Sequence, residues 1–278
     1  MTRGIAAIDE LMERASEALV EAEYFDSERL CARALRQARA ANDFERMARI
    51  CLPLQEARRQ IRQLAETSGV CRELHANLAR TISREPGCFL LQPPLLGVDA
   101  GAFRDSMRNR KVPAFVLTRE PMTRAGKWPI VAVAESSSLR GSATGMRSVR
   151  AQVDPPPGVV FTGQGLTRDL PPIAARESKS GPPSKPRRSQ PARDDRAQAA
   201  PSLQWFTAAG ESLGDAAIAV VDRSLHPAFQ ADDLIDFLNA IPEHEKLHQA
   251  LAAACRAADR AGPPKEPRQI ADANPWSF

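Results

Sequence analysis

Two histidines one helical turn apart are the clearest chemical signal in this sequence. His244 and His248 enclose Glu245 in the run "AIPEHEKLHQAL". On a helix this spacing turns both imidazole rings to one side, where they can bind Zn²⁺ while the glutamate takes a proton from a metal-bound water. The pattern raises the hypothesis of a zinc-dependent hydrolase, with His244 and His248 as metal ligands and Glu245 as the base.

The residues around the motif favour a structural interpretation. Lys246 places a cation where the metal ion would lie, and Glu266, a candidate third ligand, stands among prolines. Pro242 suits the first position of a helix, and the glutamates after it suit a first helical turn. We therefore expect a helix that begins at Pro242 and holds no cofactor, with zinc as the alternative.

The apolar residues of the N-terminal part recur with the period of an α-helix. They predict helices over 5–22 and 27–41, and a third from Asp43 that either kinks or restarts at Pro53. Short turns between them make these helices antiparallel neighbours. The first 68 residues should form a helical bundle.

Part of this bundle resembles a tetratricopeptide (TPR) repeat, over the run "LMERASEALVEAEYFDSERLCARAL". The resemblance implies a helical hairpin that binds a protein partner through a groove, and we name Tyr24, Phe25 and Phe44 as candidate contact residues. An ordinary small helical bundle is the alternative. The residues that match the repeat are Leu11, Ala15, Ala18, Tyr24, Ser27, Cys31 and Ala34.

The next region has the pattern of a small α/β module. A helix from Asp99 between the first two of its strands makes a β-α-β unit. The segment 67–83 is expected to be a helix that leads into the module. Short apolar runs predict strands over 88–96, 113–121, 128–136 and 148–156.

Composition divides the rest of the chain. Ten of the 23 prolines fall in 154–202, which predicts a disordered linker. Three helices are expected after it, over 202–221, 231–241 and 242–261. The predicted fold is mixed α+β, with a TPR-like helical bundle at 1–68, an α/β module at 69–153, a linker at 154–202, a helical domain at 203–262 and a flexible tail at 263–278.

Composition also bears on the environment of the protein. No stretch of about 18 apolar residues occurs, and the N-terminal segment has no uninterrupted apolar core for a signal peptide. The five cysteines are widely spread and form no C-x-x-C pair, which favours reduced, buried thiols. We expect a soluble cytoplasmic protein.

Charge is unevenly distributed among the segments. Residues 69–153 hold 13 basic and 6 acidic side chains, a net charge of +7, whereas 203–278 hold 6 and 11, a net charge of −5. We therefore expect residues 203–262 to dock on 69–153. The side chains predicted to face one another are Asp232, Asp233 and Asp236 on one side and Arg104, Arg108, Arg110 or Lys111 on the other. The four basic residues are also candidate partner-binding residues.

No motif names a reaction for the whole chain. The stretches "GCFLLQPPLLGVDA", "VLTREP" and "PEHEKLHQAL" together resemble bacterial proteins of unknown function, and this resemblance implies no activity. We expect a non-enzymatic protein-interaction or scaffold protein with a protein partner. Besides the zinc hydrolase, the alternative is a nucleic-acid-associated protein that uses the basic middle region, including "KPRRSQPARDDR".

Overall fold

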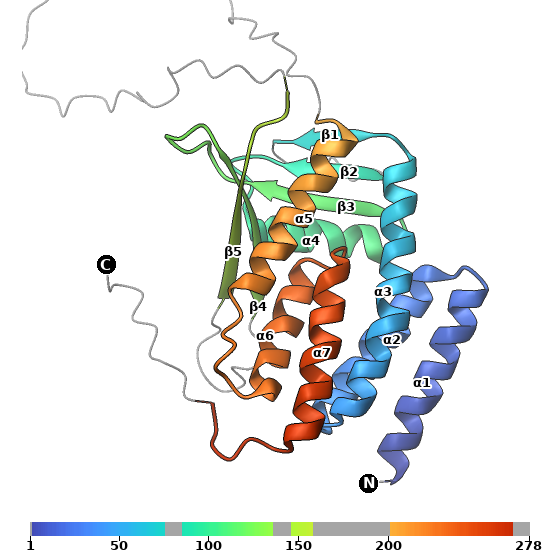
Figure 1. Ribbon diagram of the computed structural model, residues 1–278. Coiled ribbons are helices and arrows are strands. Elements are labelled where there is room, and N and C mark those ends of the chain that lie inside the picture. The colour runs from blue at the N-terminus through green and yellow to red at the C-terminus, as the bar shows by residue number, and fades with distance from the viewer. Residues whose placement is uncertain (1, 76–84, 136–145, 158–200, 269–278) are drawn as a thin grey trace, which may run out of the picture. The chain divides into compact units, whose positions relative to one another are not determined.

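Three helices at the N-terminus pack side by side, α1 on α2 and α2 on α3 (Figure 1). They are α1 (Thr2–Val20), α2 (Tyr24–Ala40) and α3 (Phe44–Thr67), which confirms the predicted helical region. Asp43 caps α3 by accepting a hydrogen bond from the Arg46 amide at 3.0 Å. Pro53 lies inside α3, and the helix continues through it.

A five-stranded mixed sheet follows, in the order β1-β2-β3-β4-β5. The first three strands are parallel, and β4 is antiparallel to both of its neighbours. Helix α4 (Gly97–Asn109) joins β2 to β3, so the predicted β-α-β unit is confirmed. The strands are β1 (Cys71–Leu74), β2 (Gly87–Leu91), β3 (Ala114–Arg119), β4 (Trp128–Glu135) and β5 (Met146–Val153).

The first strand corrects one expectation, because residues 67–83 were predicted to be a helix. Cys71–Leu74 instead pairs with β2, and Leu74 is buried in the core between α4 and the sheet. The backbone groups of this segment form hydrogen bonds to β2 and not within a helix. The periodicity of a segment does not reveal which strand will lie beside it. The rest of that predicted helix, from residue 76, lies outside the described residues.

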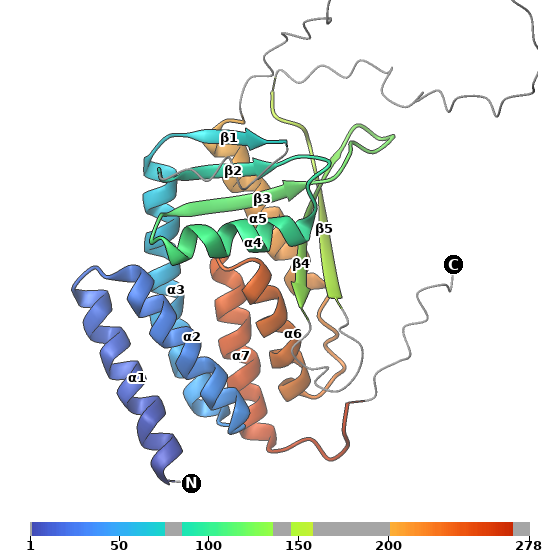
Figure 2. The ribbon, with the colours of Figure 1, turned by 180° about the vertical axis from the view of Figure 1, so that it is seen from behind.

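The three C-terminal helices are α5 (Leu203–Ala219), α6 (Pro227–Ala240) and α7 (Glu245–Ala261). Figures 1 and 2 show α4 and α5 on opposite faces of the sheet. Alternate residues of β3 serve the two faces: Val116 packs in the α4 core, while Phe115 meets Phe206 of α5 edge to face, with ring centroids 4.9 Å apart. Gly210 permits this approach, since a Cβ there would lie 2.5 Å from the Phe115 ring.

The described residues before position 157 and after position 200 belong to one compact unit. Within it α5 packs on β5, α6 packs against β4, and α7 packs along α3. The computed structural model describes residues 2–75, 85–135, 146–157 and 201–268. Most of the predicted linker, the basic run 185–196 and the tail after residue 268 therefore lie outside the described residues. None of the described helices is long and apolar enough to cross a membrane.

All five cysteines are free thiols, and Cys71 alone is half-buried while the others are buried. Burial raises the pKa of Cys31 and of Cys51 to about 12. These thiols are therefore protonated and unreactive at neutral pH, as expected for structural cysteines.

Candidate functional site

His244 does not belong to a helical turn, in contrast to the prediction that a helix begins at Pro242. Helix α7 begins at Glu245, and His244 is its N-cap, with Nδ1 accepting a hydrogen bond from the Leu247 amide at 3.2 Å. A side chain that accepts a hydrogen bond from a free amide of the first turn caps the helix, and the helix begins at the next residue. The prediction was wrong because the His244 imidazole caps α7, so the helix begins at Glu245 and Pro242 lies before it.

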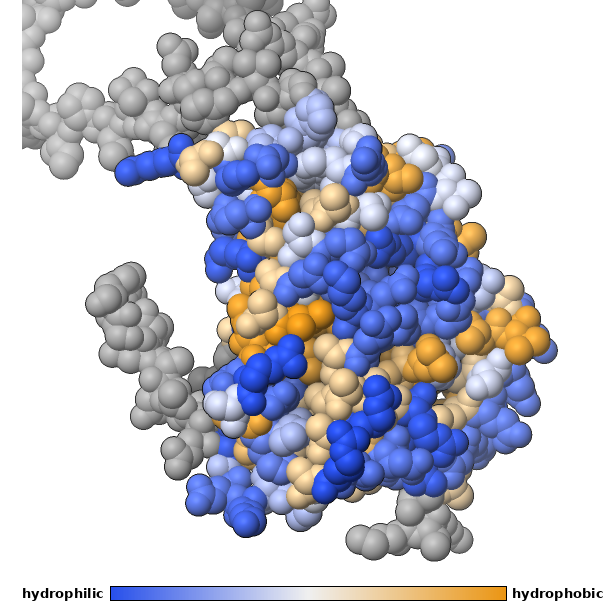
Figure 3. All heavy atoms as spheres, in the orientation of Figure 1, coloured by the Kyte–Doolittle hydropathy of each residue, from blue (hydrophilic) through white to orange (hydrophobic). Residues whose placement is uncertain are grey.

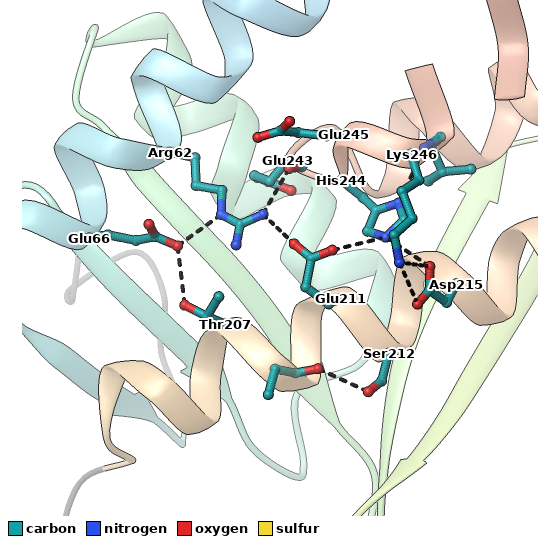
Figure 4. A network of polar contacts seen from close by, with 12 residues as sticks. Arg62, Glu66, Thr207, Glu211, Ser212, Asp215, Glu243, His244, Glu245 and Lys246 are labelled. Carbon is teal, nitrogen blue, oxygen red and sulfur yellow. Dashed lines mark hydrogen bonds and ion pairs between the residues drawn. The ribbon is translucent and has the colours of Figure 1, made fainter. Parts of the chain in front are cut away.

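The other ring nitrogen of His244 faces two carboxylates of α5 (Figure 4). Nε2 lies 3.3 Å from Oε2 of Glu211 and 3.4 Å from Oδ1 of Asp215, without the alignment of a true hydrogen bond. Because Nδ1 accepts a hydrogen bond from the Leu247 amide, this nitrogen is unprotonated and the ring proton is on Nε2, on the side of the two carboxylates. Contact with His244, and then with the Arg62 guanidinium, lowers the pKa of Glu211 to about 2.

Arg62 and Lys246 complete this polar cluster. Arg62 of α3 donates to Oε1 of Glu211 at 2.7 Å and to the Glu243 carbonyl oxygen at 3.2 Å, while Lys246 pairs with Asp215 at 2.9 Å (Figure 4). The cluster ties α3, α5 and the start of α7 together. These contacts hold helices together. They also give Lys246 a structural role, because its ammonium group pairs with Asp215.

His248 faces a different set of groups from His244. Its ring is 1 % exposed, Nδ1 donates to the His244 carbonyl oxygen at 3.0 Å, and Nε2 lies 3.4 Å from the Arg58 guanidinium. Burial and then the positive charge of Arg58 lower the pKa of His248 to about 3, so the ring is neutral.

The zinc hypothesis required both rings to offer a nitrogen to one ion. Instead one nitrogen of His244 caps α7, the accepting nitrogen of His248 faces a guanidinium, and Glu245 lies near Gln55, with Oε2 and Nε2 3.4 Å apart. A fixed cation beside His248 opposes a second cation there. Across the described part of the chain, no three His, Cys, Asp or Glu side chains are arranged to hold a metal ion.

The acidic residues of α6 do not meet the basic residues predicted for them. Asp232 pairs with Arg39 of α2, and Asp233 pairs with Arg147 of β5 at 2.8 Å and with Arg268. Asp236, fully buried, lies 3.7 Å from Arg147. The pairing with Arg104, Arg108, Arg110 or Lys111 is therefore corrected. Helix α6 turns its acids toward α2, β5 and the C-terminal segment, whereas α4 packs on β3 and β4.

The basic residues on α4 and directly after it were predicted to meet α6, and those that pair do so elsewhere in the same unit. Arg104 is buried and donates to Glu243 at 3.1 Å, and Arg108 donates to the buried Glu28 at 3.0 Å. Lys111 pairs with Asp26, whereas Arg110 is exposed. Three of the four candidate partner-binding cations thus join α4 and the turn after it to α2 and to the loop before α7.

The aromatic candidates lie at the starts of α2 and α3. Tyr24 and Phe25 are half-buried. Phe44 is 7 % exposed, with the Arg39 guanidinium 5.7 Å from its ring centroid. Phe44 therefore has little surface left for a partner.

A groove that no motif indicated crosses α1, α3 and α7. We call it the α1–α3–α7 groove, and its cavity volume is about 910 Å³. Leu52 of α3 lies in it with 72 % of its surface exposed. Figure 3 shows apolar surface between α7 and α1, beside hydrophilic side chains. The lining residues are Met12, Ser16, Leu19, Glu45, Ala48, Arg49, Leu52, Pro53, Glu56, Arg256, Asp259 and Arg260.

The sequence contained one signal of this groove. The buried residues of α3 include Met47, Cys51 and Leu54, which follow the helical period, and Leu52 lies outside that face. A leucine off the apolar face of an amphipathic helix either contacts another element or stays exposed. Whether Leu52 contacts another element or stays exposed depends on the arrangement of the helices in the tertiary structure.

Comparisons of the chain with protein-family models, curated proteins and solved structures found no match. The function is therefore inferred from the geometry of the groove.

Proposed function

We propose that this chain is a non-enzymatic protein-interaction protein, and that its α1–α3–α7 groove binds an amphipathic helix of a partner protein. The observation that carries the proposal is Leu52, exposed to 72 % inside a groove of about 910 Å³. Grooves between helices are a common binding site for the apolar face of a partner helix.

The chemistry of the groove supports an amphipathic partner over a wholly apolar one. Met12, Leu19, Ala48 and Leu52 offer apolar surface from α1 and α3. Charged side chains from α3 and α7 also line the groove. An apolar centre with a polar rim is the usual anatomy of a protein interface.

The charges on the α7 side of the rim favour acidic groups on the partner, whereas the three acids and three arginines of the whole lining balance one another. Arg49 pairs with Glu45 at 3.5 Å on α3. On the α7 side Arg256, Asp259 and Arg260 are exposed and carry a net positive charge. Acidic residues of the bound helix should therefore lie along α7, where complementary charge raises the association rate and sets the orientation. The resemblance of residues 11–35 to a TPR repeat, which implies partner binding through a groove, agrees with this proposal.

The test is site-specific crosslinking in the native cell. The photoreactive residue p-benzoylphenylalanine replaces Leu52 in one variant and Leu64 in the control, because Leu64 is an exposed leucine of the same helix outside the groove. We expect one protein to crosslink through position 52 and not through position 64.

Binding of the purified partner then measures the contact. Leu52→Glu should raise the dissociation constant by about tenfold or more, since truncating or charging a central apolar contact costs at least about 1.4 kcal/mol. Leu64→Glu should leave it unchanged. Identical crosslinks from positions 52 and 64 would contradict the proposal that the groove is the binding site. A crosslinked product of two copies of this chain would show that the groove binds a second copy and not a partner helix.

A further inference from the structure

A second cavity lies between α2 and α6, with α3 at its base, and shares no residue with the α1–α3–α7 groove. We call it the α2–α6 cleft, and its volume is about 600 Å³. Its apolar walls include Leu35, Leu54, Phe229, Ile235 and Leu238. Both the volume and the apolar lining are those of sites that bind small molecules.

The charged side chains of the cleft are mostly cationic. Arg36, Arg39, Arg58 and Arg268 line it together with a single acid, Asp232. A cluster of guanidinium groups beside apolar walls favours an anionic ligand, because arginine binds carboxylates through two parallel hydrogen bonds.

Three of these arginines are already held by acids. Asp232 accepts two hydrogen bonds from Arg39, one of them 2.7 Å long. Arg58 donates to Glu28 at 2.9 Å, and Arg268 donates to Asp233 at 2.9 Å. These pairs hold the three guanidinium groups in place, with Glu28 shared between Arg58 and Arg108.

Arg36 is different. It is exposed on α2 at the cleft, and the described residues provide no hydrogen bond or ion pair for it. Among the described residues, Arg36 is therefore the charged side chain of the cleft that has no partner, and it lies next to an apolar cavity.

We propose that the α2–α6 cleft binds a small organic monoanion, in which one carboxylate meets Arg36 and an apolar body contacts the leucine and phenylalanine walls. Arg36, which has no partner among the described residues, can meet the negative charge of such a ligand. The apolar volume contributes affinity by removing the body of the ligand from water. This inference does not depend on the proposed function, because the two cavities are separate.

The probe is the fluorescent dye 1-anilinonaphthalene-8-sulfonate, whose sulfonate stands in for the carboxylate and whose rings stand in for the apolar body. Titration of the full chain should show saturable binding. Octanoate should displace the dye, whereas octan-1-ol and octylamine, which have the same chain without the anion, should be at least about tenfold weaker.

Three variants locate the site. Arg36→Glu should raise the dissociation constant for the dye about tenfold or more, and Arg36→Lys should weaken binding less. The matched control is Arg33→Glu, an exposed arginine of α2 outside the cleft, which should change the constant by less than about twofold. Ala32→Trp, which fills the cleft from α2, should abolish binding.

Several results would overturn the inference. They are the absence of saturable dye binding, equal displacement by octanoate and octan-1-ol, or equal effects of Arg36→Glu and Arg33→Glu. Loss of dye binding in Leu52→Glu, with full binding in Ala32→Trp, would place the dye in the α1–α3–α7 groove instead. Circular dichroism of each variant checks that it is folded.

Discussion

The imidazole of His244 lies directly on the backbone of Gly214. A Cβ at position 214 would be 2.1 Å from Cγ of the ring, a separation that side chains do not tolerate. The ring is 2 % exposed and held from the other side by the Leu247 amide, so it has no room to withdraw. Glycine at 214 is therefore what lets α5 and the start of α7 approach each other.

Gly214→Ala should destabilise the protein by about 1–3 kcal/mol, because the added methyl overpacks a buried contact. This loss should exceed the gain in helix propensity, which is at most about 1 kcal/mol. The matched control is Gly101→Ala in α4, where nothing lies within 4 Å of the added carbon. Urea unfolding of both variants measures the difference, and equal stabilities would contradict the contact.

Glu28→Gln should cost about 3–5 kcal/mol of unfolding free energy, because it leaves the buried Arg58 guanidinium without a compensating charge. Burial raises the pKa of Glu28, but the guanidinium groups of Arg58 and Arg108 outweigh burial and lower the pKa overall. The control is Glu13→Gln on the exposed face of α1. Chemical denaturation that gives the same midpoint for both variants would argue against an ionised pair.

Stability should fall as the pH drops below about 6.5 because of His248. The folded protein keeps this ring neutral, with a pKa of about 3, whereas the unfolded chain takes up a proton near pH 6.5. The stabilisation is fully present above that pH and is lost progressively below it, by about 1.4 kcal/mol between about pH 7.5 and about pH 5.5.

His248→Gln should remove this part of the pH dependence, while His75→Gln, at an exposed position, should keep it. Unfolding free energies measured at the two pH values for each variant provide the comparison. A variant His248→Gln with the slope of the original protein would show that the histidine is not the responsible group.

The described helices and strands should unfold in one cooperative transition, since α5–α7 pack on both the sheet and α3. Trp128 of β4 and Trp205 of α5 meet edge to face with ring centroids 5.7 Å apart, and they report on this contact by fluorescence. In a Trp276→Phe background, fluorescence and far-ultraviolet circular dichroism should give the same midpoint. Separate midpoints would mean that the N-terminal helices unfold independently.

Local periodicity was sufficient to predict most elements of the fold. Ile8, Leu11, Ala15 and Ala18 lie on the predicted face of α1 and are all buried. The strands on either side of α4, β2 and β3, were likewise predicted from short apolar runs. Such patterns are informative because the period of burial within an element is set by its own backbone geometry.

The sequence could not identify the partners of its charged residues. Asp232 meets Arg39, which precedes it by 193 residues, and Arg104 meets Glu243 across 139 residues. The strand Cys71–Leu74 likewise depends on β2 beside it. The residues themselves carry charge and propensity, but which of them meet is decided by packing between distant elements. For the same reason the exposure of Leu52, and the lack of a partner for Arg36 among the described residues, are properties of the tertiary structure, because each depends on which other helices lie nearby.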